Sequence, residues 1–472
     1  MTTSSRRKPL TLVCSLFLTV ATLSLVDGAE LRRGPYLQSQ RPDGITVRWR
    51  TDASVRYTSV LRYGKDFDHL DRALAAEEID GHYPGVLDWQ VKLAGLEPDT
   101  AYYYALEADR ANLCGADANH CFRTAPASKA PHKLRLWAIG DFGANRPRAD
   151  SPATVMAAKG PMDPALVRNG FRKFNRGQAL DGFILLGDNA YPTGSDEMYQ
   201  AAFFNVYADE LRCTPLWPCT GNHDIDDAYV HLFGASDGGR GLGIPMPSHG
   251  NLYYSVDLAN LHLVVLDPWK DWLQETSEVD HAPWQRQLAW LKKDLAATDQ
   301  EWIVVLDHFP VYCDGNYQSD QGPLATLRQC IVPLLDRYGV DAFLSGHDHT
   351  YQRSYLLHGF TGKADSFDPA RHLKAKGDGR DAPLRKRPGP DSGTLYVVSG
   401  TGGGSRPNGS FAHPAMIPFQ TPQGTRRGLT VPGSLVLEID GLVLRGWQVG
   451  VDGQVLDHFV LEHESPRECA RH

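Results

Sequence analysis

Two kinds of hydrophobic pattern divide the chain. Between residues 31 and 127, short segments alternate apolar and polar residues, as in GITVRWRTD (residues 44–52) and YTSVLRYG (residues 57–64). A period of two is typical of strands with one buried face. Several such strands at short spacing, with a Leu-x-Pro-x-Thr turn at residues 96–100, predict an N-terminal β-sandwich over residues 31–127.

After the linker ASKAPHK the alternation stops, and short apolar runs alternate with segments of helical length. The segment PWQRQLAWLKKDLAA repeats its large apolar residues at helical spacing. Strands that are apolar on both faces and separated by helices predict a layered α/β domain over residues 133–463. The apolar runs are LRLWAIG (134–140), DGFILLG (181–187), EWIVVLD (301–307) and VDAFLSG (340–346).

The last third of the chain holds one segment of different composition. Residues 361–392 are rich in charge, glycine and proline, which predicts an exposed insertion. Its basic run, Arg385 to Arg387, is either a solvated loop or part of a lid that adds positive charge to a substrate site. Asp-Gly pairs at residues 440–441 and 452–453 indicate hairpin turns between the closing strands.

Composition and charge limit the partners. The 472 residues are 42% hydrophobic and 22% charged with a net charge of −8, which fits a globular protein of two or three domains. An acidic chain is a poor partner for nucleic acid or an anionic membrane, so we expect neither. A site for an anionic substrate would have to create its own positive charge. The oligomeric state is left open.

The N-terminus resembles an export signal. A basic flank precedes the apolar run at residues 10–25, and small residues follow it near residue 29. We expect residues 1–29 to be a signal peptide of a secreted or periplasmic protein, with an uncleaved anchor as the alternative. Eight cysteines fit export. Three local disulfides are expected from the spacing of Cys114 and Cys121, Cys213 and Cys219, and Cys313 and Cys330.

Five apolar runs end in residues that can bind a metal. The motifs are GDFG, GDNAY, GNHD, VLDH and GHDH. Ligands of layered α/β folds bind beyond the carboxyl ends of strands, so these five ends could meet at one place. Each motif alone is weak, because an aspartate there is more often a turn or helix cap and a single histidine is more often a core residue. The candidate ligands are Asp141, Asp188, Tyr191, Asn222, His308, His347 and His349.

The donor types indicate the chemistry. Aspartate, asparagine, histidine and tyrosine together suit hard or borderline cations such as ferric iron, zinc or manganese. A bridging carboxylate would hold two metals about 3.5 Å apart, which is the arrangement of two-metal hydrolysis. Such a pair lowers the pKa of a bound water and neutralises the charge of a phosphoryl group.

The series GDFG, GDNAY, GNHD, VLDH and GHDH resembles the metallophosphoesterase superfamily, and specifically the purple acid phosphatases. General members of the superfamily have a ligating histidine two residues after the first aspartate, where this chain has Gly143. Purple acid phosphatases instead have a ligating tyrosine three residues after the second aspartate, which here is Tyr191. The likeness covers residues 31–462, and its N-terminal part is similar to the family's fibronectin-III-like domain.

The resemblance implies a layered α/β/β/α catalytic domain and a role for each residue. Asp141, Tyr191 and His349 would hold Fe(III). Asn222, His308 and His347 would hold a divalent ion (Zn, Fe or Mn). Asp188 would bridge the two, and a metal-bound hydroxide would attack phosphorus. His223 would stabilise the phosphoryl oxygens or protonate the leaving alkoxide. Asp224 and Asp307 are candidates for residues that do not bind the metals but hold the ligands in position.

We therefore expect an acid phosphatase that hydrolyses phosphate monoesters, best at mildly acidic pH. A phosphodiesterase or nucleotide pyrophosphatase on the same metal site is the first alternative. A secreted binding module on an inactive metal scaffold is the second, and it predicts the loss of a ligand or of His223. Neither is lost in this sequence. Asn408-Gly409-Ser410 is a glycosylation sequon that matters only in a eukaryotic secretory pathway.

Overall fold

The computed structural model describes most of the chain outside the N-terminal segment. The expected signal peptide lies almost entirely outside the described residues, as does the sequon asparagine Asn408, so those expectations stay predictions. Among the described residues, no helix is both long and apolar enough to cross a membrane. The described ranges are 29–54, 56–79, 83–143, 163–234, 252–267, 281–387, 389–406, 409–422 and 424–464.

The N-terminal segment forms two antiparallel sheets that pack face to face, which confirms the predicted β-sandwich. Its core is built from the inward-facing residues of the alternating strands, including Val47, Trp49 and Leu106. One sheet has the order β1 (Leu31–Arg41), β2 (Gly44–Asp52), β6 (Val86–Leu93) and β5 (Glu77–Ile79). The other has the order β4 (Arg72–Ala75), β3 (Ser59–Gly64), β7 (Ala101–Ala108) and β8 (Ala111–Gly115), and β9 (Cys121–Arg123) also pairs with β7.

The second part of the chain contains two larger mixed sheets. The seven-stranded sheet has the order β12 (Leu216–Cys219), β11 (Gly182–Leu186), β10 (Leu134–Ile139), β22 (Gly433–Asp440), β23 (Val443–Gly450), β24 (Val455–His463) and β18 (Leu384–Lys386). The six-stranded sheet has the order β13 (Tyr254–Leu258), β14 (Leu261–Val265), β15 (Trp302–Leu306), β16 (Ala342–Ser345), β19 (Thr394–Ser399) and β17 (Tyr351–Leu357). A short ribbon pairs β20 (Phe419–Thr421) with β21 (Gly424–Arg426).

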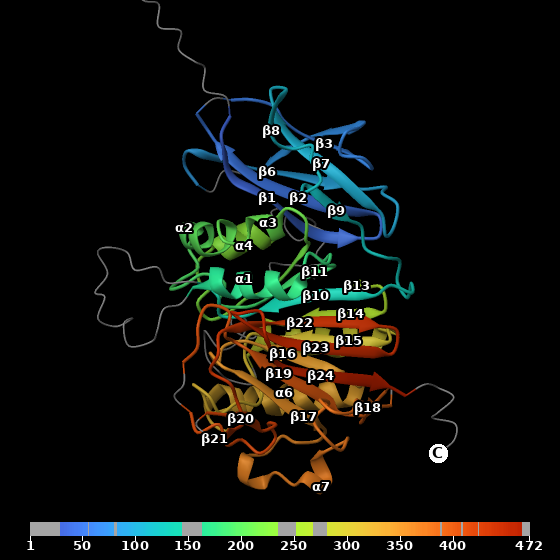
Figure 1. The fold of residues 1–472 in the computed structure, drawn as a ribbon, viewed down its shortest axis with the longest axis vertical. Helices are drawn as coiled ribbons and strands as arrows, with labels where there is room; N and C mark the ends of the chain where they lie inside the picture. The colour runs from blue at the N-terminus through green and yellow to red at the C-terminus, as the bar shows by residue number, and fades with distance from the viewer. Residues whose placement is uncertain are drawn as a thin grey trace, which may run out of the picture.

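These sheets stack between two layers of helices. In β10, Leu136 and Ala138 enter the core between the sheets, whereas Trp137 and Ile139 face the helices. The seven-stranded sheet is covered by α1 (Pro164–Asn175), α2 (Asp196–Tyr199), the π-helical turn Gln200–Phe204, α3 (Ala208–Leu211) and α4 (Ala228–Phe233). The six-stranded sheet is covered by α5 (Ala282–Ala297) and α6 (Gly322–Tyr338). The expected α/β/β/α layering is therefore confirmed. Figure 1 shows the N-terminal sandwich stacked against the helical layer that contains α1 to α4.

Parallel pairing brings the motif-bearing strand ends together. Strands β10, β11 and β12 run parallel in one sheet, and β14, β15, β16 and β19 run parallel in the other. Each of the five candidate motifs follows the carboxyl end of β10, β11, β12, β15 or β16. This arrangement explains why apolar strands buried on both faces end in polar residues at one edge.

The basic run in the segment 361–392 is not a lid over a substrate site. It forms β18, which pairs parallel with β24 at the edge of the seven-stranded sheet. Lys386 is buried and lies 2.6 Å from Asp341, because that buried carboxylate needs a counter-charge. Arg387 pairs with Glu464 at 3.0 Å. The rest of the segment includes a 3₁₀ turn at Ala364–Ser366 and α7 (Pro369–His372), and it is largely exposed.

The expected local disulfides are absent, because all six cysteines of the described residues are free thiols. Cys114 lies opposite Leu106 of β7 and Cys121 lies opposite Tyr103. Three residues of strand span about 10 Å, beyond the Cα separation of about 4.4–6.8 Å that a disulfide requires.

The other two cysteine pairs point to different surroundings. The Cys213 thiol lies 3.3 Å from the carbonyl oxygen of Asp209, whereas the Cys219 thiol lies 3.4 Å from that of Leu266 in the neighbouring sheet. The Cys313 thiol lies 3.5 Å from the carbonyl oxygen of Tyr317. Cys330 instead contacts Trp284 of α5, because it lies on the face of α6 that packs against that helix.

Buried arginines of the sandwich hold it against the second part of the chain. Arg33 of β1 lies 2.9 Å from a carboxylate oxygen of Asp196 at the start of α2, and its side chain is fully buried. Arg50 of β2 pairs with the other oxygen of Asp196 and with Asp88. Arg48 donates to the carbonyl oxygen of Leu232 at 2.6 Å. One carboxylate therefore balances two buried cations across the interface.

We predict that Asp196→Ala lowers the free energy of unfolding by about 3–5 kcal/mol, because it leaves Arg33 and Arg50 buried without that partner. Urea unfolding followed by circular dichroism measures the change. Asp209→Ala is the matched control, because Asp209 is half exposed in its pair with Arg172 and should contribute less than about 1 kcal/mol. Equal midpoints for both variants would contradict the role of Asp196.

A second buried pair predicts a pH dependence of stability. His262 of β14 lies 2.7 Å from Asp257 and 2.9 Å from Asp294 of α5. Burial lowers the pKa of His262, but the two carboxylates outweigh burial and raise it to about 9. Because this folded-state pKa exceeds the value of about 6.5 expected in the unfolded chain, the stabilisation is complete below pH 6.5 and is lost as the pH rises through 9.

We predict that the stability advantage of the wild type over His262→Gln shrinks by about 2–3 kcal/mol between pH 6.5 and pH 9.5. Urea unfolding of both proteins at several pH values gives this difference. Comparing the two proteins at each pH cancels the titration of all other groups. An advantage that is constant across the range would show that His262 is not charged in the folded protein.

Candidate metal centre

Four buried side chains face one point at the edge of the seven-stranded sheet. The hydroxyl of Tyr191 lies 3.2 Å from Asp141 Oδ1, 2.9 Å from Asp188 Oδ2 and 3.0 Å from His349 Nε2. His349 Nε2 also lies 3.3 Å from Asp141 Oδ1. Oxygen and nitrogen donors that converge in this way can surround one cation, and Asp141, Asp188 and His349 form a group whose ligand atoms lie within 4.8 Å of one another.

A second set of donors lies beside the first. His308 Nε2 is 3.3 Å from Asp188 Oδ1 and 3.2 Å from Asn222 Oδ1. The ring of His347 lies next to that of His308, with 5.1 Å between centroids. Asp188 therefore presents Oδ2 to the first set and Oδ1 to the second. The structure brings together all seven of the ligands that the sequence nominated.

Neighbouring groups fix the orientation of these ligands. His308 Nδ1 lies 2.8 Å from the carbonyl oxygen of Leu186, which only accepts, so Nδ1 carries the proton and Nε2 is left for a metal. Asp141 Oδ2 accepts from the backbone N–H of His347 at 2.8 Å. Asp188 Oδ1 accepts from the backbone N–H of His223 at 2.9 Å. Each contact joins two of the motif loops.

Three of the ligands have a backbone conformation that side chains disfavour. Asp141, Asp188 and His347 have φ values of 55°, 52° and 65°. Such left-handed positions are uncommon outside glycine and cost about 1–3 kcal/mol each. They recur here at the first turn after β10, β11 and β16, where the chain must turn sharply to aim a side chain at the edge of its sheet.

The glycines beside the ligands allow the loops to touch backbone to backbone. A Cβ atom on Gly221 would lie 2.3 Å from Asp188 Oδ1, and one on Gly346 would lie 2.5 Å from Asp141 Oδ2. A Cβ on Gly143 would lie 2.5 Å from the Cα of Ala190 and 2.6 Å from the backbone nitrogen of Tyr191. The space beside Gly143 is therefore filled by the loop that carries Tyr191.

Asp224 links two of the motif loops. Its carboxylate accepts from the backbone N–H groups of Gly221 and Asn189 at 2.9 and 3.1 Å and from the hydroxyl of Tyr199 at 2.6 Å. Burial and the nearby charge of Asp188 raise the pKa of Asp224 to about 7. The sequence nominated this residue as a support for the ligands, and its contacts are those of a residue that positions them.

Asp307 and Asp348 lie on the side of the six-stranded sheet. Burial raises the pKa of Asp307 to about 8, and its Oδ1 accepts from the backbone N–H of Phe309 at 2.9 Å. Asp348 accepts from the backbone N–H groups of Gly315 and Asn316 at 3.0 and 2.9 Å. It therefore ties the 313–320 loop to the GHDH turn. Sequence reasoning missed Asp348, although it is the central residue of that motif.

His223 lies next to the first donor set. Its ring packs edge-on against Tyr191, with 4.7 Å between centroids. Nδ1 lies 2.7 Å from the carbonyl oxygen of Pro192, so Nδ1 carries a proton and Nε2 remains for another partner. This tautomer leaves His223 able to donate or accept a proton at Nε2 beside the two ligand sets.

Two further residues border the centre and were not nominated from the sequence. Tyr317 stacks on the ring of His347, with 4.0 Å between centroids, and is 41% exposed. Arg406 donates its backbone N–H to the carbonyl oxygen of His349 at 3.0 Å. No motif marked them, because the long loops between strands that bring them here follow no simple spacing.

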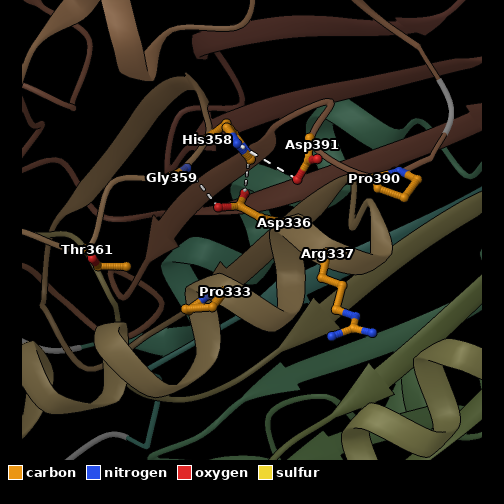
Figure 2. Close-up of a pocket in the computed structure, with 8 residues that line it drawn as sticks. All are labelled: Pro333, Asp336, Arg337, His358, Gly359, Thr361, Pro390 and Asp391. Atoms are coloured by element: carbon orange, nitrogen blue, oxygen red, sulfur yellow. Dashed lines mark hydrogen bonds and ion pairs between the residues drawn. The ribbon is translucent and has the colours of Figure 1, made fainter.

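A separate pocket of about 500 Å³ lies at the carboxyl end of α6, and none of the nominated ligands lines it. Figure 2 shows two ion pairs in it: His358 lies 3.3 Å from Asp336 and 3.9 Å from Asp391. Asp336 also accepts from the backbone N–H of Gly359 at 2.8 Å. The chemistry that the sequence predicts belongs to the strand ends and not to this pocket.

Comparison with known proteins agrees with this geometry. Residues 134–351 match the model of the calcineurin-like phosphoesterases, and residues 33–124 match that of the purple acid phosphatase N-terminal domain. The rat tartrate-resistant acid phosphatase type 5 is 31% identical over 49% of this chain and 70% of its own length. The chain belongs to the purple acid phosphatase family.

Other relatives extend the likeness over more of the chain. The purple acid phosphatase 21 of Arabidopsis thaliana is 29% identical over 69% of this chain and 67% of its own length. The solved structure of purple acid phosphatase PPD1 from yellow lupin superimposes on this chain with a TM-score of 0.62 at 18% sequence identity. The superposition covers 92% of this chain and 75% of the lupin chain, and it shows that the two share a fold. Purple acid phosphatases are metal-dependent phosphatases of the metallophosphoesterase superfamily, and this chain is an enzyme of that class.

Proposed function

We propose that this protein hydrolyses phosphate monoesters at a centre of two metal ions that Asp188 bridges. The observation that carries the proposal is the position of that carboxylate. Oδ2 faces the tyrosine of the first donor set and Oδ1 faces the histidine of the second, at 2.9 and 3.3 Å. A carboxylate that contributes one oxygen to each of two adjoining sets is suited to join a metal pair.

The two donor sets differ in a way that suits two different ions. The first contains two carboxylates, a phenol and one imidazole, which is a hard, anionic set that favours Fe(III). The second contains two imidazoles, an amide oxygen and the shared carboxylate, which suits a divalent ion such as Zn, Fe or Mn. The members of the first set are Asp141, Asp188, Tyr191 and His349, and those of the second are Asp188, Asn222, His308 and His347.

When bound, the metal pair would lower the pKa of a coordinated water and offset the charge of the phosphoryl group. The chain itself would supply the proton for the leaving group. His223 holds its Nδ1 proton on Pro192 and directs Nε2 away from it, so a protonated Nε2 could donate to the departing alkoxide. The same N–H could first hydrogen-bond a phosphoryl oxygen, which would orient the ester for attack.

Tyr191→Phe should remove the visible charge-transfer band of the iron-loaded protein, because the band requires a tyrosinate on Fe(III). A visible spectrum with metal analysis measures this, and circular dichroism checks that the fold is intact. Tyr317→Phe is the matched control, because it removes a phenol beside the centre that belongs to neither donor set and should keep the band. An iron-loaded wild type without such a band would contradict the assignment of Tyr191.

His223→Ala should reduce turnover of a chromogenic phosphate monoester by about 10²–10⁴-fold, and Asp188→Asn should abolish turnover together with binding of one metal. His458→Ala is the control, because this exposed histidine lies on β24, belongs to neither donor set, and has its Nε2 3.2 Å from the carbonyl oxygen of Arg380. Unchanged turnover in both site variants would refute the proposal. A wild type that prefers a chromogenic diester would favour a phosphodiesterase on the same site.

A further inference from the structure

Arg406 stands at the end of a glycine-rich loop that follows β19. Its backbone N–H donates to the carbonyl oxygen of His349 at 3.0 Å, and its own carbonyl oxygen accepts from the side chain of Asn316. Asn316 in turn accepts from the backbone N–H of His349 at 2.9 Å. These contacts fix the backbone of Arg406 between the GHDH turn and the 313–320 loop, directly beside the metal ligands.

The guanidinium of Arg406 has no carboxylate partner within the described part of the chain. Its Nε is buried and makes no hydrogen bond there. The other buried arginines of this domain are neutralised, as Arg353 is by Asp457 at 2.9 Å and Arg328 is by Asp320 at 2.9 Å. A partly buried cation that lacks such a partner has donors to offer to an anion that arrives from outside.

Arg406 lies next to both donor sets. Its backbone N–H contacts His349 of the first set, and its carbonyl oxygen contacts Asn316. The residue after Asn316 is Tyr317, whose ring stacks on His347 of the second set with 4.0 Å between centroids. Arg406 therefore supplies a positive charge next to both sets, on a protein whose net charge is −8.

We propose that Arg406 binds the non-bridging oxygens of the substrate phosphate and makes the centre favour monoesters over diesters. The inference rests on the proposed function. A guanidinium presents a planar fork of donors that matches two oxygens of one phosphate group. A monoester offers three non-bridging oxygens and a diester offers two, so the second ester group of a diester would compete with Arg406 for space and remove one of its acceptors.

The test uses Arg406→Gln and Arg406→Lys in the full-length, metal-loaded protein. Isothermal titration calorimetry with inorganic phosphate should show about ten- to hundredfold weaker binding to Arg406→Gln, and an intermediate loss for Arg406→Lys, which keeps the charge without the fork. Metal content and the visible band should match the wild type. The kcat/KM for p-nitrophenyl phosphate should fall more than that for bis(p-nitrophenyl) phosphate.

Arg385→Gln is the control, because it makes the same charge change on the edge strand β18, where Arg385 pairs with Glu462. Phosphate affinity in Arg406→Gln within twofold of the wild type, in an active enzyme, would overturn the inference and leave the proposed function standing. Loss of metal from both Arg406 variants would also overturn it. A wild type that hydrolyses no ester but binds phosphate through Arg406 would instead refute the proposed function, and one that does neither would refute both.

Discussion

The position of the Asp188 carboxylate relative to His308 depends on how closely the two sheets pack together. Asp188 follows β11 of the seven-stranded sheet, whereas His308 follows β15 of the six-stranded sheet, and 3.3 Å separates their ligand atoms. A shift of one sheet by about 1 Å would take Asp188 out of reach of one donor set, since metal–ligand distances are fixed to about 0.2 Å. The close-packed core between the sheets therefore determines whether Asp188 can reach both donor sets. Its members include Leu186, Leu306 and Leu344, each within three residues of a ligand.

The same closeness explains the local sequence of the motifs. Loops from neighbouring strands meet backbone to backbone, and a Cβ at Gly187 would lie 2.4 Å from the ring of His308. Glycine removes that obstacle, while the ligands beside it take up left-handed φ values at Asp141, Asp188 and His347. Hydrogen bonds that the loop amides donate to Asp224 and Asp348 offset part of this strain and stop the loops from relaxing. The protein's own hydrogen bonds therefore help to hold these side chains in place.

Much of this arrangement was predictable, because it follows from short-range pattern. Apolar strands ending in Asp, Asn or His predicted the layered fold and the proximity of most of the candidate ligands, since parallel strands must end at one edge. What could not be predicted depends on long-range packing. The pairing of Lys386 with Asp341 and the approach of Arg406 to His349 join segments with no common spacing. The prediction of local disulfides was wrong for the same reason. Nearness in sequence does not tell which residue of β7 Cys114 or Cys121 lies opposite, or which face of α6 Cys330 occupies.

The relation between Gly143 and Tyr191 shows what the structure adds to a motif. In the sequence, the absence of one ligand and the presence of another are two independent changes. In the structure they compete for the same space, because a Cβ at residue 143 would lie 2.6 Å from the backbone nitrogen of Tyr191. The amide of Gly143 also donates to the carbonyl oxygen of Asp188 at 3.3 Å, which holds the two loops together. A histidine at 143 would have to push the 188–192 loop outward and would withdraw the Tyr191 hydroxyl from Asp141 and His349. A side chain at residue 143 and the present position of Tyr191 are therefore incompatible on steric grounds.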